Sequence, residues 1–149
     1  MELTALRLEN VEEAARLHGL AMAEGLGGPA WTAETFSTLL RTPGTFGWMV
    51  PKAGLLLIRQ AMDEAEIFTI GVSPAARRTG VASALLETAC IALAALKVER
   101  LLLEVAVDNQ PAQRFYEREG FKTVGRRPGY YKRGAGSVDA LIMELRLAA

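Results

Sequence analysis

Three apolar segments, at residues 46–50, 54–60 and 66–72, follow one another with only short breaks between them. Short segments rich in Leu, Ile, Val and aromatic residues that end at turn-forming residues are typical of β-strands. The break before the third segment contains Met62-Asp63-Glu64, and that segment ends at Ser73-Pro74. The sequence therefore predicts a three-stranded meander, which excludes a regular alternation of strand and helix.

Helical and strand patterns continue on both sides of this meander. Asn10 can cap a first helix that begins at Val11, and Thr32 can open a second helix. After the meander, apolar residues recur at helical spacing from Val81 to Leu93. We expect helices at 11–23, 32–42, 80–97 and 109–119. Further strands are expected near 3–8 and at 100–107, 121–125 and 140–147. A long basic connection should join the last two strands.

This order of elements predicts an α/β (α+β) fold in a single domain over residues 1–149. The domain should contain one mixed central sheet of about seven strands flanked by about four helices. Half of the 149 residues are hydrophobic, so a chain of this length can bury a sizeable core. The Gly-rich stretch 24–30 is expected to form a loop.

The charged residues balance, because Lys plus Arg and Asp plus Glu both number 17. This balance argues against a nucleic-acid-binding or membrane-surface protein, since both need a surplus of positive charge. The single cysteine, Cys90, allows no internal disulfide, and the first residues lack the basic start and apolar run of a signal peptide. We therefore expect a cytoplasmic protein that binds neither nucleic acid nor a membrane.

Residues 66–82 contain the most informative pattern: a strand, a turn, and a helix that begins inside Arg-x-x-Gly-x-Ala at 77–82. A helix N-terminus presents unpaired backbone N–H groups and a partial positive charge, which favour a phosphate group. Gly80 and Ala82 allow phosphate oxygens to approach the backbone, and the arginines of the turn add positive charge. Taken alone, the pattern is equally compatible with an ordinary strand–turn–helix whose arginines are solvated.

A second motif at residues 109–121 reads Asn-x-x-Ala-x-x-x-Tyr-x-x-x-Gly-Phe. With both motifs present, the chain resembles the GNAT superfamily of acetyltransferases, and the order of elements also matches that fold. Within the superfamily it is most similar to the RimI-type N-terminal protein acetyltransferases, over residues 66–147. The resemblance implies an enzyme that transfers an acetyl group from acetyl-CoA to a primary amine and needs no metal. It rests further on Leu103-Glu104-Val105, Phe115-Tyr116, Gly129-Tyr130-Tyr131 and residues 139–143.

The resemblance implies that acetyl-CoA binds between the third strand of the meander and the helix after it. Backbone groups of Ile70, Gly71 and Val72 would bind the pantetheine arm, with the Val72 N–H as an oxyanion donor. Asn109 would hydrogen-bond the same arm and also cap its helix. The alternatives are plain strand pairing and plain capping, and a splayed or bulged strand would favour cofactor binding. The other implied cofactor-binding residues are Arg77, Arg78, Thr79, Gly80, Val81, Ala82 and Ser83.

Two side chains are implied as the catalytic pair. Glu104 lies in an apolar strand and matches the glutamate that, in RimI-type enzymes, accepts the proton of the amine through water. Partly apolar surroundings raise the pKa of a carboxyl group, which suits it to act as a base. Tyr116, one helical turn beyond Ala112, matches the tyrosine that protonates the departing thiolate. The alternatives are a solvated strand glutamate and a core aromatic residue beside Phe115.

The resemblance also implies the acceptor: the N-terminal α-amine of a protein, such as a ribosomal protein. The basic connection 126–133 would line the peptide-binding face, with Tyr130 and Tyr131 as substrate-binding residues; a solvated loop is the alternative. Two other functions stay open. One is acetylation of a small-molecule or lysine amine by the same fold, and the other is a non-catalytic acyl-CoA-binding module. A monomer or a homodimer is expected.

The remaining chemically active side chains are expected to be structural. Cys90 lies mid-helix among apolar residues and is interpreted as a core thiol. His18, the only histidine, has no partner cluster in the sequence and is interpreted as incidental. No grouping of His, Cys, Asp and Glu has the spacing of a metal site. Trp31 is expected to pack in the core or to border a substrate groove.

Overall fold

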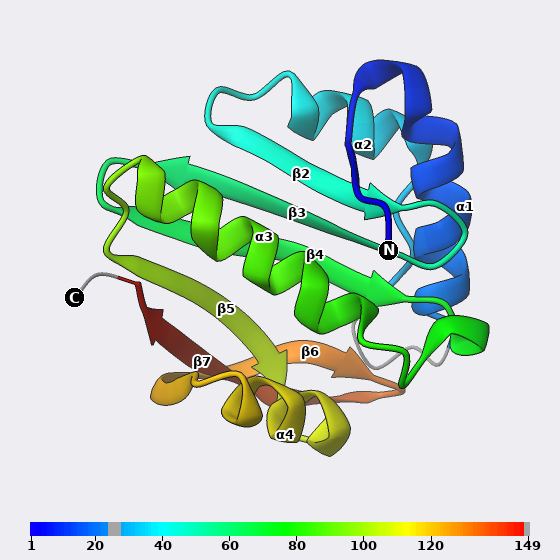
Figure 1. The fold of residues 1–149 in the computed structure, drawn as a ribbon. Helices are drawn as coiled ribbons and strands as arrows, with labels where there is room; N and C mark the ends of the chain where they lie inside the picture. Colours follow the sequence, from blue (N-terminus) through cyan, green and yellow to red (C-terminus); the bar gives the residue numbers. More distant parts are fainter. Residues whose placement is uncertain (24–27, 148–149) are drawn as a thin grey trace.

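The computed structural model describes residues 1–23 and 28–147, and within these ranges the chain forms a seven-stranded mixed sheet with strand order β1-β2-β3-β4-β5-β7-β6 (Figure 1). The predicted sheet flanked by four α-helices is therefore confirmed for the described residues. The loop expected at 24–30 falls mostly outside them. The strands are β1 (Thr4–Ala5), β2 (Thr45–Val50), β3 (Gly54–Ala61), β4 (Glu64–Val72), β5 (Arg100–Ala106), β6 (Lys122–Arg133) and β7 (Gly136–Arg146), and the helices are α1 (Val11–Ala21), α2 (Ala33–Leu40), α3 (Val81–Ala95) and α4 (Gln110–Arg118).

The predicted meander is present as β2, β3 and β4, which pair antiparallel. β3 is buried on both faces, which explains its unbroken apolar run. Leu56 and Ile58 belong to a core cluster with α3, whereas Leu55 and Leu57 belong to a second cluster with α1 and α2. The sheet is thus a layer between helices: α1 and α2 cover one face, and α3 and α4 cover the other (Figure 1).

α3 connects β4 to β5, and these two strands run parallel, as a helical crossover requires. The inner side of α3 buries the predicted apolar residues, including Val81, Leu85 and Leu93. The helix begins immediately after Gly80 and ends at Ala95, slightly before the predicted end. This crossover places the first turn of α3 beside the last residues of β4, where the sequence predicts a phosphate site.

Two details of the N-terminal prediction are wrong. Leu8, expected in an opening strand, lies in a 3₁₀ turn and is 48% exposed, because β1 is only two residues long. Asn10 stands directly before α1, but its side chain accepts a hydrogen bond from the Arg7 N–H and donates one to the Ala5 carbonyl. It therefore fixes the preceding turn and does not cap the helix. Thr32 caps α2 as predicted.

The long connection predicted between the last two strands is also wrong, because β6 and β7 form a hairpin with a short turn. Pro128 and Gly129 are turn signals in the sequence, but here they occupy an irregularity in the register of β6. Asp139 on β7 holds this irregularity by accepting hydrogen bonds from the Gly129 N–H and the Arg126 side chain. The supposed substrate loop at 126–133 is therefore part of an edge strand.

Candidate active site

A gap opens in the middle of the sheet, where β4 and β5 separate. Their pairing covers only residues 64–66 of β4 and 100–102 of β5. On its other side β4 stays paired with β3, but a register shift between Leu57 and Ile58 leaves Phe68 as a bulge. The splayed and bulged strand that favours cofactor binding over plain strand pairing is therefore present.

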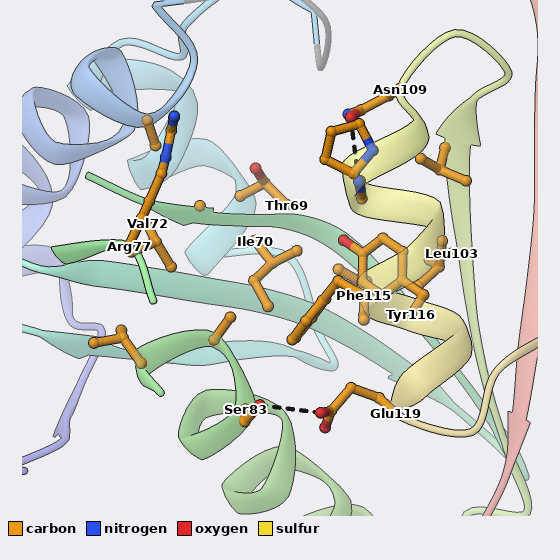
Figure 2. Close-up of a pocket in the computed structure, with 18 of the residues that line it drawn as sticks. Thr69, Ile70, Val72, Arg77, Ser83, Leu103, Asn109, Phe115, Tyr116 and Glu119 are labelled. Carbon is orange, nitrogen blue, oxygen red and sulfur yellow. Dashed lines mark hydrogen bonds between the residues drawn. The ribbon is translucent and has the colours of Figure 1, made fainter. Parts of the chain in front are cut away.

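A cavity of about 680 Å³ occupies this gap, within the size range of small-molecule sites. Its walls come from both faces of the sheet: the end of α1 and Tyr131 on one face, and the first turn of α3 together with α4 on the other. Figure 2 shows Ile70 of β4 facing Phe115 of α4 across the cavity, whereas the Thr69 side chain leaves the strand on the opposite side. Ligands that approach from opposite faces of the sheet can meet there.

The first turn of α3 forms one end of the cavity. Gly80 precedes it with φ of 85°, a left-handed conformation that costs other residues about 1–2 kcal/mol. The first intrahelical bond runs from the Ala84 N–H to the Gly80 carbonyl, so the N–H groups of residues 81–83 have no partner within the helix. Arg77 and Arg78 line the same end. Unpaired N–H groups at a helix start, in a cavity that two arginines also line, make this end suitable for an anion.

Most residues predicted to bind the cofactor line this cavity, but two side chains have other partners. Thr79 lies outside the lining, and its hydroxyl donates to the Ala76 carbonyl, which holds the turn before α3. The Ser83 hydroxyl donates to Glu119 at 3.0 Å, which leaves the Ser83 N–H for an anion. The cavity brings together Ile70, Gly71, Val72, Arg77, Arg78, Gly80, Val81, Ala82, Ser83 and Asn109.

α4 is fastened to the end of β5 by side-chain amides. Asn109 caps the helix, because its Oδ1 accepts a hydrogen bond from the Ala112 N–H at 3.4 Å. The Gln113 side chain donates to the carbonyls of Ala106 and Val107, both at 2.9 Å. These bonds fix the position of α4 relative to the gap and therefore the position of its tyrosine.

Tyr116 extends from α4 into the cavity. Its side chain is 8% exposed, and its ring packs edge-on against Phe115 and Phe121. Figure 2 shows the hydroxyl directed from α4 toward β4, and no group in the described part of the chain forms a hydrogen bond with it. Burial, with a smaller effect of Tyr131, raises its pKa above the ordinary value. The phenol therefore keeps its proton at neutral pH and can donate it.

Glu104 enters the cavity from β5, with its neighbours Leu103 and Val105 turned into the α3-side core. Its side chain is 16% exposed, and Oε2 lies 2.8 Å from Nε of Arg127 on β6. The Arg127 N–H does not point at this oxygen well enough to form a hydrogen bond. Among the residues that the structure describes, Oε2 therefore accepts no hydrogen bond. A partly buried carboxylate with unused acceptor capacity is suited to hold a water or to receive a proton.

The two predicted substrate-binding tyrosines are placed differently. Tyr131 lines the cavity beside Glu104 and donates a hydrogen bond to the Glu104 carbonyl at 3.3 Å. Burial, then the charge of Glu104, raises the pKa of Tyr131 to about 12. Tyr130 is 48% exposed, packs edge-on against Tyr131 and carries the Arg127 guanidinium over its ring. Only Tyr131 therefore reaches the cavity.

His18 is not incidental, which corrects the sequence interpretation. It is 1% exposed and lies 2.9 Å from the hydroxyl of Thr69, which lines the cavity. Its other ring nitrogen accepts a hydrogen bond from the Trp31 N–H, and the Trp31 ring stacks on it. Thr69 is a cavity-lining residue that sequence reasoning missed, because no local pattern shows a contact between positions so far apart in the chain.

Cys90 packs beside the α3-side core, and burial raises the pKa of its thiol, in agreement with the interpretation as a core residue. Within residues 1–23 and 28–147, no three or more His, Cys, Asp or Glu side chains are grouped so that they could hold a metal ion. Over the same ranges, no helix combines the length and the apolar character that crossing a membrane requires.

Comparison with known proteins agrees with this geometry. Residues 30–121 match the acetyltransferase (GNAT) family. A ribosomal protein bS18-alanine N-acetyltransferase of Escherichia coli K12 is 36% identical over 96 residues, which cover 64% of this chain and 65% of that relative. The match thus spans just under two thirds of the relative's length. A putative enzyme of the same description from Bacillus subtilis is 32% identical over 143 residues, which cover 93% of this chain and 90% of the relative.

Among solved structures, the ribosomal-protein-S18-alanine N-acetyltransferase of Escherichia coli superimposes with a TM-score of 0.86 at 28% sequence identity. The superposition covers 99% of this chain and 94% of that one. The family match includes both motifs and the whole gap between β4 and β5. The family match covers more than half of the chain, and the Bacillus subtilis relative aligns with nearly all of it. The chain therefore belongs to the acetyltransferase (GNAT) family.

Proposed function

We propose that this protein transfers the acetyl group of acetyl-CoA to the N-terminal α-amine of another protein. The observation that carries the proposal is the cavity through the sheet, because it connects an anion site at the start of α3 with a buried tyrosine and a partly buried glutamate. Members of this family use acetyl-CoA. Its phosphates suit the anion site, and its thioester needs proton-transfer groups and hydrogen-bond donors.

The cofactor half of the proposal uses backbone groups more than side chains. The N–H groups of residues 81–83 and the side chains of Arg77 and Arg78 would bind the pyrophosphate. Beyond residue 66, β4 has no pairing with β5, so backbone groups of residues 70–72 that face the gap are open to the pantetheine arm. We assign the Val72 N–H as oxyanion donor and Asn109 as a further pantetheine contact.

The proposed reaction needs a proton acceptor and a proton donor. The neutral amine attacks the thioester carbonyl, so that a C–N bond forms and the C–S bond breaks. Glu104 accepts, through a water, the proton that the amine loses, and Tyr116 gives its proton to the sulfur. The proton passed to Glu104 returns to solvent, and Tyr116 recovers one. The products are an amide and the CoA thiol.

The choice of a protein N-terminus rests on the similarity to bS18-alanine N-acetyltransferases. The placement of Tyr131 supports it, because this side chain lines the cavity next to Glu104 on the face away from α3. Tyr130 lies outside the cavity on the edge strand β6. We propose that it contacts acceptor residues beyond the first one.

Thiol release from acetyl-CoA tests the proposal. The acceptors are short peptides starting with Ala or Ser, polyamines, and lysine-containing peptides with blocked N-termini. We expect turnover with the free peptide N-termini only. Turnover confined to polyamines or lysine would replace the acceptor assignment, and CoA binding without turnover of any acceptor would support the non-catalytic module.

Gly80→Ala tests the anion site. Its φ of 85° is left-handed, and an added Cβ would meet no atom within 4 Å, so the substitution acts through backbone strain. We expect a stability loss of about 1 kcal/mol and, because relaxation turns the N–H groups of α3 away, a roughly tenfold higher Kd for acetyl-CoA. Calorimetric titration and thermal unfolding measure the two effects.

Gly134→Ala is the matched control for this substitution. Gly134 has φ of 56°, an equally open Cβ position, and a place in the turn between β6 and β7, outside the cavity lining. We expect a similar loss of stability with unchanged acetyl-CoA affinity. Equal effects of both variants on the Kd would show that the conformation of Gly80 has no specific role in binding.

A further inference from the structure

The hydrogen bonds of His18 determine which of its ring nitrogens carries the proton. The backbone N–H of Trp31 donates to Nδ1 at 3.0 Å. An N–H can only donate, so Nδ1 must be unprotonated, and the hydrogen of the neutral ring must be on Nε2. Burial lowers the pKa of His18 to about 4, which keeps the ring neutral at physiological pH. Nε2 therefore donates to Thr69 Oγ1 at 2.9 Å.

This bond orients the hydroxyl of Thr69. Because Oγ1 accepts the His18 hydrogen, its own hydrogen must find a different acceptor. No second hydrogen bond of this hydroxyl is formed with any residue in 1–23 or 28–147. Thr69 follows the bulge of β4 and lines the cavity, where Figure 2 shows it beside Ile70. At the wall of the cavity, the hydroxyl is thus a donor for which the described residues provide no acceptor.

The position of His18 and Thr69 separates this donor from the cofactor end of the cavity. The bond ties β4 to α1, and the end of α1, at Ala21 and Met22, lines the cavity as well. The anion site lies at α3, which covers the other face of the sheet. Thr69 therefore borders the α1 side, where Glu104 and Tyr131 also lie and where the acceptor is assigned above.

We propose that Thr69 donates a hydrogen bond to the first carbonyl oxygen of the acceptor peptide, and that His18 is the positioning residue that directs this hydroxyl. The inference rests on the proposed function. A peptide N-terminus has a carbonyl next to its amine-bearing carbon, whereas polyamines and lysine side chains have none. A site built to hydrogen-bond a substrate group rejects analogues without it, since its polar groups are left unpaired. Thr69 would therefore select peptide N-termini over other amines.

The test compares two acceptors in the full-length protein: an Ala-starting peptide, and the same peptide with a methylene group in place of the first carbonyl. Thr69→Val keeps the shape of the side chain but removes the hydroxyl, and Thr69→Ser keeps the hydroxyl. We expect Thr69→Val to lower kcat/KM about fivefold for the carbonyl peptide, through a higher KM, because one hydrogen bond to the acceptor is lost. Thr69→Ser should retain most of the activity, and neither variant should change kcat/KM for the methylene analogue.

The role of His18 is tested by a double-mutant cycle. His18→Phe keeps an aromatic ring between Trp31 and Phe36 but removes both hydrogen bonds, whereas His18→Gln keeps a donor. Thermal unfolding and acetyl-CoA titration are used to check that each variant is folded. We expect His18→Phe to reduce selectivity for the carbonyl peptide in the wild-type background and to have no further effect on it in Thr69→Val. His18→Gln should recover part of the selectivity.

Two failures are distinguishable. If the wild-type protein binds acetyl-CoA but acetylates neither peptide, the proposed function is wrong and the inference falls with it. If the wild type acetylates the carbonyl peptide and Thr69→Val lowers kcat/KM equally for both acceptors, or for neither, the proposed function stands and the role of Thr69 is refuted. Independent effects of His18→Phe and Thr69→Val on selectivity would remove His18 as the positioning residue.

Discussion

Tyr116→Phe is expected to lower kcat about 100-fold, because a positioned general acid contributes about 10²–10⁴ to a rate. Acetyl-CoA affinity should change by less than about twofold, since the ring keeps its contacts with Phe115 and Phe121. The hydroxyl has no hydrogen-bond partner in the described structure, so its removal should not lower the melting temperature. A catalytic role thus predicts a large loss of rate without a loss of stability.

Steady-state kinetics with a saturating peptide acceptor, calorimetric titration of acetyl-CoA and thermal unfolding measure these three quantities on the same preparation. The structural alternative for Tyr116, a core aromatic residue, predicts the opposite pattern: an unchanged kcat. A wild-type rate in Tyr116→Phe would therefore remove the tyrosine from the mechanism. A higher Kd for acetyl-CoA with an unchanged kcat would assign it to cofactor binding.

Glu104→Gln is expected to lower kcat by a factor of about 100 or more, since the amide cannot accept the proton of the amine. The substitution preserves the size of the side chain and leaves an oxygen near Arg127, so stability and acetyl-CoA affinity should remain close to those of the wild type. Single-turnover measurements, in which enzyme with bound acetyl-CoA is mixed with peptide, follow the chemical step directly.

Glu66→Gln is the matched control. Glu66 pairs with Leu102 of β5 and so projects from the same face of the sheet as Glu104, but it lies outside the cavity lining. Burial, then the charge of Glu104, raises the pKa of Glu66, so the two carboxylates interact. We expect a change in kcat of less than about threefold. Similar losses in both variants would mean that negative charge on this face, and not a base at Glu104, supports the reaction.

The predictable parts of the fold are those in which one stretch of chain carries its own signal. The unbroken apolar run from Leu55 to Ile58 predicts a strand that is buried on both faces. In the structure, each face of this strand packs in a core cluster with helices. The helix after Gly80 is predictable from the spacing of Val81, Leu85 and Leu93. The β6–β7 hairpin is not, because Pro128 and Gly129 mark a turn locally and a partner across the strand, Asp139, keeps them in the sheet.

The candidate site divides in the same way. The end proposed to bind an anion is continuous in the sequence, a turn followed by a helix N-terminus, so residues 77–82 alone predict this local structure. The convergence of Glu104 and Tyr116 on one cavity depends on the separation of β4 from β5 and on the bulge at Phe68, which no local pattern shows. Only the family resemblance placed these two side chains together in advance. The contact between His18 and Thr69 had neither kind of signal.

The most direct test of the central claim uses one peptide that begins with Ala and also contains an internal lysine, so that both amines compete for the same enzyme. The peptide is incubated with acetyl-CoA, and fragment masses then locate the added acetyl group. If the protein is an N-terminal acetyltransferase, the group is found on the α-amine and the lysine is unmodified. Acetylation of the lysine alone, or of both amines at similar rates, would contradict the proposed function.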